Sequence, residues 1–137
     1  MTVEPKRYAT LDWIGGLRFS AGTPDGPHVV LDGDGVAGPS PVTTLICAAG
    51  ACSGADVVSI LEKKRIVLTK CHVEAGGVRR DDYPKRFTSV WLRFHLAGEG
   101  LTEAAAKQAV ELSVTKYCSV LLSLNPDIVV TTEIVVG

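Results

Sequence analysis

Cysteine is the residue type in this chain whose placement most clearly suggests chemistry. The chain contains Cys47, Cys52, Cys71 and Cys118, and Cys52 lies between two glycines in the stretch "GACSG". A cysteine thiolate is a nucleophile and a metal ligand, whereas a free cysteine can equally serve as a small buried apolar residue. The first question is therefore whether Cys52 reacts or only fills space in a core.

Spacing restricts which cysteines can act together. Cys47 and Cys52 are five residues apart, which is about 140° of rotation on a helix, so these two cannot pair within one helix. Cys71 falls in a predicted strand, and we assign no role to Cys47 or Cys71. Cys52 and Cys118 each lie on a helix that is predicted to pack in the core. If the two helices are neighbours, their sulfur atoms can approach bonding distance.

Other catalytic motifs lack the surroundings that they need. "GDGVAG" at positions 33–38 matches the dinucleotide fingerprint, but two prolines follow and delay the helix that should face a pyrophosphate. "GACSG" also matches a hydrolase nucleophile elbow, and His72 and His95 come later in the chain. One domain of this length has no room for the usual hydrolase sheet. Because CxxC, HExxH and His–carboxylate clusters are absent from the sequence, we expect no metal site.

The elements that must position the cysteines can be predicted from the pattern of apolar residues. Three short runs, "RYATLDWIG", "GLRFSAG" and "HVVLDGDG", predict an antiparallel meander with "GTPDGP" as a hairpin turn. A central helix should begin near Ser40 and Pro41, with the serine as N-cap, and end in the basic cluster 63–65.

The second half of the chain predicts a hairpin, a helix and a strand. "IVLTKCHVEAGG" and "RFTSVWLRFHLAG" are the hairpin strands, and alternation from Val90 to Leu96 indicates one buried face. Thr102 should cap a second helix that runs to Asn125–Pro126, with Cys118 on its buried face. "DIVVTTEIVVG" follows as a strand. The predicted fold class is α+β, a single domain of residues 1–137 with antiparallel strands around two core helices.

Composition narrows the classes of function. The chain has 137 residues, 46% hydrophobic and 21% charged, with 14 basic and 15 acidic residues and a net charge of −1. This balance gives no electrostatic reason to expect nucleic acid or an anionic membrane as a partner. The polar start of the chain lacks the apolar core of a signal peptide, so we expect a cytoplasmic protein with reduced cysteines. Asp56 lies inside the apolar run 42–61, which favours a core helix over a membrane span.

Three segments carry a resemblance to a known family. "SPVTTLICAAGACSGADVVSILEKKR", "YPKRFTSVWLRFHLAGEGL" and "AVELSVTKYCSVLLSL", in this order, resemble the OsmC/Ohr family of thiol-dependent hydroperoxide reductases, and the OsmC-like branch in particular. The resemblance extends from the first strands to the last. It implies the OsmC-like fold and an intertwined homodimer with active sites at the subunit interface.

The resemblance also implies a mechanism. Cys52 matches the family's peroxidatic cysteine and Cys118 its resolving cysteine. The Cys52 thiolate would attack the O–O bond of an organic hydroperoxide, and Cys118 would convert the resulting sulfenic acid into a disulfide. An external dithiol would reduce that disulfide, so no bound cofactor is expected. Sulfenic acid is reversible when a thiol is near, which explains why this chemistry uses two cysteines.

The sequence departs from the family pattern where the thiolate is activated. The family uses an arginine from an early strand, held by a glutamate just after the Ser/Asn-Pro that begins the central helix. Val42 stands at the glutamate position, and Arg18 lies one residue beyond the arginine position. Lys116 and Arg86 are other candidate cations. Asp56, one turn after Cys52, would oppose ionisation of the thiol unless it is neutralised.

Two hypotheses follow. The first is an organic hydroperoxide reductase acting in oxidative-stress defence, a peroxiredoxin-like enzyme with Cys52, Cys118 and Arg18 at its site. The second, favoured by Val42 in place of the glutamate, is a catalytically weak module on the same fold that senses redox state or binds a small ligand.

Overall fold

A computed structural model describes residues 7–137. They divide into two compact units, Met1–Leu45, described from residue 7, and Ile46–Gly137. The predicted absence of a signal peptide concerns the start of the chain, and residues 1–6 lie outside the described part. The predicted extent of a single domain, residues 1–137, stays a prediction.

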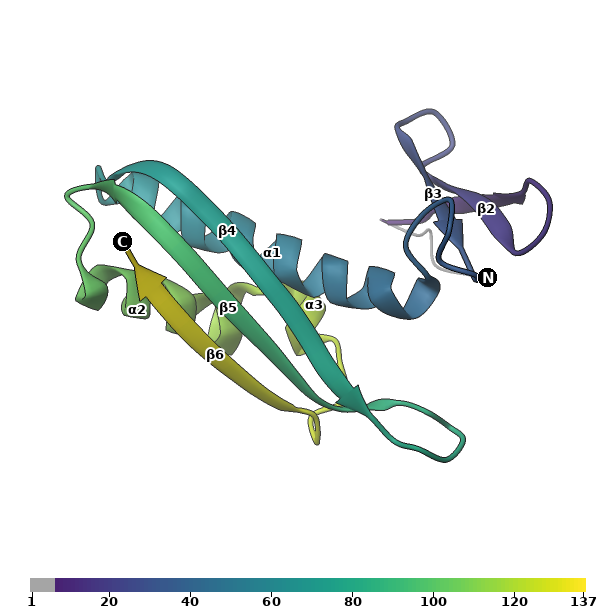
Figure 1. Cartoon of the computed structure of the whole chain (residues 1–137). Helices are drawn as coiled ribbons and strands as arrows, with labels where there is room; N and C mark the ends of the chain where they lie inside the picture. The colour runs from purple at the N-terminus through teal and green to yellow at the C-terminus, as the bar shows by residue number, and fades with distance from the viewer. Residues whose placement is uncertain (1–6) are drawn as a thin grey trace, which may run out of the picture. The chain divides into compact units, whose positions relative to one another are not determined.

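The N-terminal unit is the predicted antiparallel meander. Strands β1 (Thr10–Trp13), β2 (Arg18–Gly22) and β3 (His28–Asp32) form a sheet in the order β1-β2-β3. The turn between β2 and β3 occupies the "GTPDGP" segment, as predicted, and its Gly26 amide donates to the Thr23 carbonyl at 3.2 Å. Figure 1 shows this meander in purple and dark blue.

The glycine-rich segment after β3 is a loop that its own carboxylate organises. Asp32 accepts hydrogen bonds from the backbone amides of Asp34 at 2.9 Å, Val36 at 3.3 Å and Ala37 at 3.0 Å. These amides, led by those of Ala37 and Asp34, hold the pKa of Asp32 below its usual value. Asp32 therefore occupies amides of this loop that could otherwise donate to a phosphate.

Helix α1 (Pro41–Lys63) begins where the sequence predicts. The Ser40 hydroxyl accepts from the Thr43 amide at 3.1 Å, and the Ser40 carbonyl accepts from the Thr44 amide at 2.8 Å, so Ser40 caps the first turn. By length and composition α1 could cross a bilayer. Its residues Val57 and Leu61 are fully buried in the core of the C-terminal unit, which accounts for part of its apolar character.

The C-terminal unit contains a three-stranded sheet in the order β4-β5-β6. Strands β4 (Val67–Arg79) and β5 (Phe87–Glu99) form the predicted antiparallel hairpin. Strand β6 (Val129–Val136) pairs with β5 in parallel, so the expectation of antiparallel strands does not extend to this pair. The reason is the connection from β5 to β6, which passes through helices, and such crossovers bring the next strand back in the same direction.

Two helical segments connect β5 to β6. Helix α2 (Glu103–Leu112) has Thr102 as its N-cap, as predicted, with the Thr102 hydroxyl accepting from the Ala105 amide at 3.1 Å. A π-helix, η1 (Ser113–Tyr117), and the short helix α3 (Ser119–Leu122) follow. Figure 1 shows α2, α3 and the adjoining part of α1 on one side of the β4-β5-β6 sheet.

The core of the C-terminal unit lies between this sheet and the helices. Strand β5 supplies the predicted alternation, because Val90, Leu92, Phe94 and Leu96 are buried and their intervening neighbours are not. Cys118 belongs to the same core and is 0% exposed. The predicted α+β fold class and the buried position of Cys118 are confirmed.

Candidate functional site

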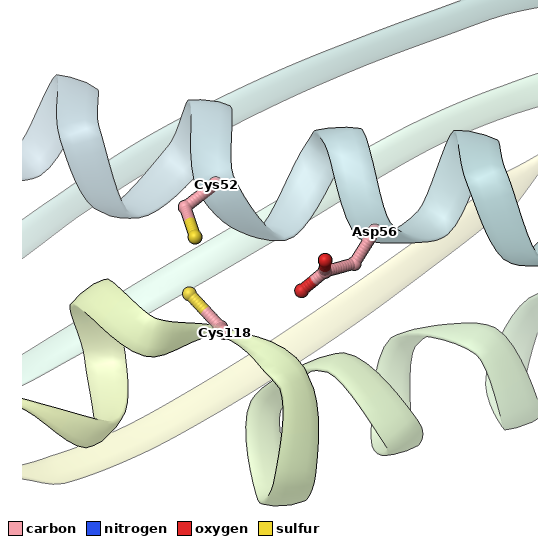
Figure 2. Close-up of side chains that lie close together, drawn as sticks. All are labelled: Cys52, Asp56 and Cys118. Carbon is pink, nitrogen blue, oxygen red and sulfur yellow. The ribbon is translucent and has the colours of Figure 1, made fainter.

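Two segments distant in sequence bring two thiols and a carboxylate together. Helix α1 supplies Cys52 and Asp56, which are four residues apart and so lie on one helical face. Cys118 comes from the segment between η1 and α3. The two Sγ atoms and a carboxylate oxygen of Asp56 all lie within 4.8 Å of one another. Figure 2 shows the two sulfur atoms pointing toward each other across the gap between the segments.

The glycines around Cys52 explain how α1 is oriented. A Cβ atom on Gly54 would lie 3.4 Å from Val73 Cγ2, and one on Gly50 would lie 3.5 Å from the Ala75 Cβ atom. Both glycines therefore face strand β4 and let the helix pack closely on it. Cys52 is two residues from each glycine, about 200° around the helix, so its side chain points away from β4. The "GACSG" stretch thus presents the cysteine to the segment that carries Cys118.

Cys118 lies at a break in the backbone, and this corrects the prediction of one continuous helix. Its amide donates to the Ser113 carbonyl at 2.8 Å, which closes the π-helical turn. Its own φ of −73° and ψ of 96° are extended, and its Sγ accepts from the Leu121 amide at 3.4 Å as the N-cap of α3. π-Helical turns are rare and often occur at functional sites. Here the turn aims the Cys118 thiol at α1.

A buried chain of hydroxyls holds the carboxylate. The Ser113 hydroxyl donates to Asp56 Oδ2 at 2.9 Å. The Ser113 and Ser53 oxygens are 2.8 Å apart, and both serines are fully buried. Because a hydroxyl has a single hydrogen and that of Ser113 goes to Asp56, Ser53 is the donor in the second bond. Asp56 is therefore held by the segment that carries Cys118, through Ser113, rather than by the arginine or lysine that charge alone would suggest.

The environment of Cys118 disfavours its thiolate. Burial raises the pKa of Cys118 to about 11, and the hydrogen bond and charge of the neighbouring Cys52 act in the same direction. The amides of Leu121 and Val120 oppose this rise. Burial also raises the pKa of Cys71, whose thiol lies on β4 outside the cluster. Cys118 is therefore a neutral thiol at physiological pH.

The three candidate cations for activating the Cys52 thiol each interact with another group in the structure. Arg18, on β2, donates from Nε to the Gly15 carbonyl at 3.4 Å and interacts electrostatically with Asp32. Arg86 pairs with Asp127 at 2.5 Å. The Lys116 ammonium lies 5.2 Å from the centre of its neighbour's ring, that of Tyr117. Assignment of Arg18 to the site stays a prediction.

The histidines lie away from the thiols. His72 and His95 are cross-strand partners on β4 and β5, with ring centres 5.5 Å apart, and His95 Nε2 lies 2.6 Å from Glu74 Oε1. His95 alternates with the buried residues Phe94 and Leu96, so it is on the opposite face of the sheet from the core. A cysteine hydrolase would need a histidine beside Cys52, and these two do not provide it.

An open cavity lies beside Asp56. Its volume is about 450 Å³, and it extends along α1 toward the end of α2. It is lined by Asp56, Ser59, Ile60, Lys63, Lys64, Leu112 and Tyr117. Asp56, the cluster residue that lines this cavity, therefore borders a space large enough for a small molecule.

Sequence reasoning missed two features of this site. The serines that hold Asp56 gave no signal, since Ser53 and Ser113 are sixty residues apart. The second missed feature is the cluster of thiols and a carboxylate, because the expectation of no metal site considered only motifs within one segment. The cluster of Cys52, Asp56 and Cys118 instead combines residues from two segments, and the Cys-x-x-x-Asp spacing on one helical face was its only local sign.

Comparison with known proteins identifies the family of this chain. The family model for OsmC-like protein matches residues 32–133. Protein YhfA of Escherichia coli strain K12 is 40% identical over 124 residues, which is 90% of this chain and 92% of that protein. A crystal structure of a protein from Aquifex aeolicus VF5 is 29% identical with a TM-score of 0.82, covering 98% of this chain and 99% of the other.

A more distant structure shares the fold. The organic hydroperoxide resistance protein OhrB of Bacillus subtilis has a TM-score of 0.64 at 16% identity, covering 93% of this chain and 98% of that one. The chain belongs to the OsmC-like family, as its cysteine segments predicted. The fold, with its two sheets and its helices, is that of the OsmC-like proteins.

Proposed function

We propose that the protein is a thiol-dependent peroxidase that reduces organic hydroperoxides, with Cys52 as the attacking residue and Cys118 as the resolving residue. The observation that carries the proposal is that the sulfurs of Cys52 and Cys118 lie in one chain within 4.8 Å of each other. Membership of a family whose structural relatives include organic hydroperoxide resistance proteins supports a role in redox or stress defence.

The first step is oxidation of Cys52. Its thiolate attacks one oxygen of the hydroperoxide, the O–O bond breaks, and the leaving alkoxide takes a proton to become an alcohol. Cys52 is left as a sulfenic acid. Cys52 is partly exposed whereas Cys118 is fully buried, so peroxide can reach only the former sulfur without rearrangement. The difference in exposure supports this division of roles between the two cysteines.

The second step is formation of the disulfide. The Cys118 sulfur attacks the sulfenic sulfur, and its proton leaves with the hydroxide as water. The sulfurs must close from within 4.8 Å to about 2.05 Å, the length of a disulfide. Cys118 follows a π-helical turn and precedes a helix of four residues, so this short segment can supply the movement. An external dithiol then reduces the disulfide, and no bound cofactor is needed.

The proposal includes a homodimer in the cytoplasm. Large apolar side chains on both units are exposed in the single chain, including Trp13, Leu45, Leu122 and Val129. Exposed apolar surface of this kind is typical of protein interfaces. An intertwined dimer would cover such surface and complete the site from the partner chain. Sedimentation equilibrium tests this part, since a monomer at micromolar concentration would contradict it.

Peroxide turnover is the direct test of the enzyme. Reduced protein, dithiothreitol and cumene hydroperoxide are mixed, and loss of peroxide is followed against Cys52→Ser as the control. We expect catalytic loss with the native chain and only the background rate with the variant. Equal rates of peroxide loss for the native chain and Cys52→Ser would refute the peroxidase function.

A second function is favoured by the surroundings of the thiols. Val42 stands where the family has a glutamate, and Arg18, Arg86 and Lys116 interact with other groups. A site with a weakly activated thiol suits a redox sensor or a small-ligand-binding module on the same fold. Such a protein would be oxidised once by a stoichiometric amount of peroxide but would not turn over with dithiol.

A further inference from the structure

We propose that the reduced protein binds a zinc ion through Cys52, Asp56 and Cys118. The proposal concerns the same residues as the proposed function, but the binding itself does not depend on peroxidase activity. It rests on the donor set, the distances and the hydrogen bonds of the cluster.

The distances fit a single ion. When three atoms all lie within 4.8 Å of one another, a point exists that is no more than about 2.8 Å from each. Zinc bonds to thiolate sulfur at about 2.3 Å and to carboxylate oxygen at about 2.0–2.2 Å. The three ligand atoms therefore need to move inward by less than about 1 Å each. Cys52 and Asp56 already share one helical face, the spacing with which a helix supplies two ligands to one ion.

The donor types favour zinc. Two thiolates are soft ligands that select zinc, copper(I) or iron–sulfur centres over magnesium and calcium, and a carboxylate is an ordinary third zinc ligand. Three protein ligands with a fourth position left open are typical of zinc sites that exchange a bound water. The cavity beside Asp56 can supply that open position.

Asp56 has the kind of hydrogen-bond support that is common for metal-ligating carboxylates. Ligating carboxylates are commonly hydrogen-bonded by a second set of residues that fixes their orientation. Here Ser113 donates to Asp56 Oδ2 and Ser53 donates to Ser113, both from fully buried positions. Among residues 7–137, Ser113 is the hydrogen-bond donor to this carboxylate, so Oδ1 keeps its lone pairs for a further ligand.

Charge is consistent with the geometry. Coordination converts both thiols into thiolates, and two thiolates beside a carboxylate within 4.8 Å repel one another unless a cation lies between them. The ion pairs between residues 8 and 137 involve Arg86, Arg93 and His95, and none of these pairs includes Asp56. A divalent ion would offset this charge and deprotonate both thiols by coordination.

Oxidation would release the ion. The two coordinated thiolates give up two electrons and form the Cys52–Cys118 disulfide. The O–O bond of an organic hydroperoxide accepts those electrons and, with two protons from solvent, becomes an alcohol and water. Zinc loses both sulfur ligands and leaves to solvent. Bound zinc would therefore keep the pair reduced until peroxide arrives, and this release step rests on the proposed function.

The test measures zinc binding by competition with a chromophoric chelator, using reduced protein in which Cys47→Ser and Cys71→Ser remove the exposed thiols. We expect one zinc per chain. Asp56→Asn should weaken binding by at least about tenfold, the lower limit usually seen when even a hydrogen-bond partner of a ligand is removed. Glu62→Gln, an exposed carboxylate on the same helix, is the matched control and should bind as the background protein does.

A second variant, Ser113→Ala, keeps the test decisive if Asp56→Asn does not fold. Ser113→Ala leaves all three ligands in place and should weaken zinc about 10- to 100-fold through loss of its bond to Asp56. Circular dichroism reports the folding of each variant. Cobalt in place of zinc should give a thiolate charge-transfer band that Cys118→Ser reduces. Binding that is equally tight in the background protein, Asp56→Asn and Ser113→Ala would overturn the proposal.

Failure of this inference can be told apart from failure of the proposed function. Binding of one zinc per chain without peroxide turnover would support the zinc site and refute the peroxidase function. Peroxide turnover without zinc binding would support the peroxidase function and refute the zinc site. Diamide, which oxidises neighbouring thiols while being reduced to a hydrazine, should release the ion without any peroxide. Zinc that stays bound after both cysteines have been oxidised would contradict the assigned ligands.

Discussion

The raised pKa of Cys118 predicts a slow and strongly pH-dependent reaction with alkylating reagents. An ordinary cysteine has the reference value of 9.0, and Cys118 has a pKa of about 11. At neutral pH its thiolate fraction is therefore about 100-fold smaller than in the unfolded chain. The higher basicity of the thiolate returns a factor of about 6 to 10, because nucleophilicity rises with pKa with a coefficient of about 0.4–0.5. Alkylation should thus be at least about tenfold slower in the folded protein, and burial slows it further.

The assay uses iodoacetamide and peptide mass spectrometry on the folded and the urea-unfolded protein across a range of pH. Ionisation and access separate in the pH profile, since limited access lowers the rate without moving the midpoint. We expect the folded midpoint of Cys118 well above that of the unfolded chain. Cys52→Ala should lower it, because the hydrogen bond and charge of Cys52 raise this pKa. A midpoint at or below 9.0, or one that Cys52→Ala does not lower, would refute the reasoning.

Three further predictions concern helix packing, the loop after β3 and the helix start. Gly54→Ala should stabilise the fold by about 0.5–1 kcal/mol through helix propensity, because its Cβ would lie 3.4 Å from Val73 Cγ2, an ordinary contact. Gly54→Val should instead cost about 1–3 kcal/mol by overpacking, and equal urea midpoints for the two variants would argue against the close approach to β4. Asp32→Asn should destabilise the protein, with a difference present above the reference pKa of 3.8 and lost as pH falls through the lowered native pKa. Urea unfolding at several pH values measures this, and a difference independent of pH would count against the loop hydrogen bonds. Val42→Glu should add about 0.3–1 kcal/mol at the start of α1 and should raise peroxide turnover if Arg18 is the activating cation. Unchanged turnover, or no loss with Arg18→Ala, would point to another cation.

Local patterns predicted most of the secondary structure. The start of α1 follows from Ser40 and Pro41, whose side chain and ring favour the first helical turn, and Thr102 does the same for α2. The buried face of β5 follows from strict alternation between Val90 and Leu96. Such features depend on neighbouring residues alone, so a single sequence contains the information.

Two features of the C-terminal unit were not predicted, and only the first depends on contacts that the sequence does not reveal. The break at Cys118 has no glycine or proline to mark it within 113–118. It forms where Ser113 bonds to Ser53 and Asp56 on α1 and where the Cys118 amide bonds back to the Ser113 carbonyl. The parallel pairing of β5 and β6 could have been predicted, because a strand–helix–strand connection favours it.

The candidate site also combines features that the sequence predicts with features that depend on distant contacts. Cys52 and Cys118, the two cysteines on which the proposed function depends, were selected from their segments, and their proximity was conditional on the two helices being neighbours. The structure meets that condition, with both sulfurs and Asp56 within 4.8 Å. The role of Asp56 could not be predicted, because its partner Ser113 is far away in the sequence. Sequence reasoning therefore treated Asp56 as a negative charge near the thiol and as evidence against a membrane span.

The most direct test of the central claim is to map the cysteines after one equivalent of cumene hydroperoxide. The reduced protein, with Cys47→Ser and Cys71→Ser, is digested and analysed by mass spectrometry alongside the intact chain. The account predicts that the intact chain loses two hydrogens and that the peptides containing Cys52 and Cys118 become linked within one chain. A stable gain of oxygen on Cys52 with Cys118 still a free thiol would contradict it.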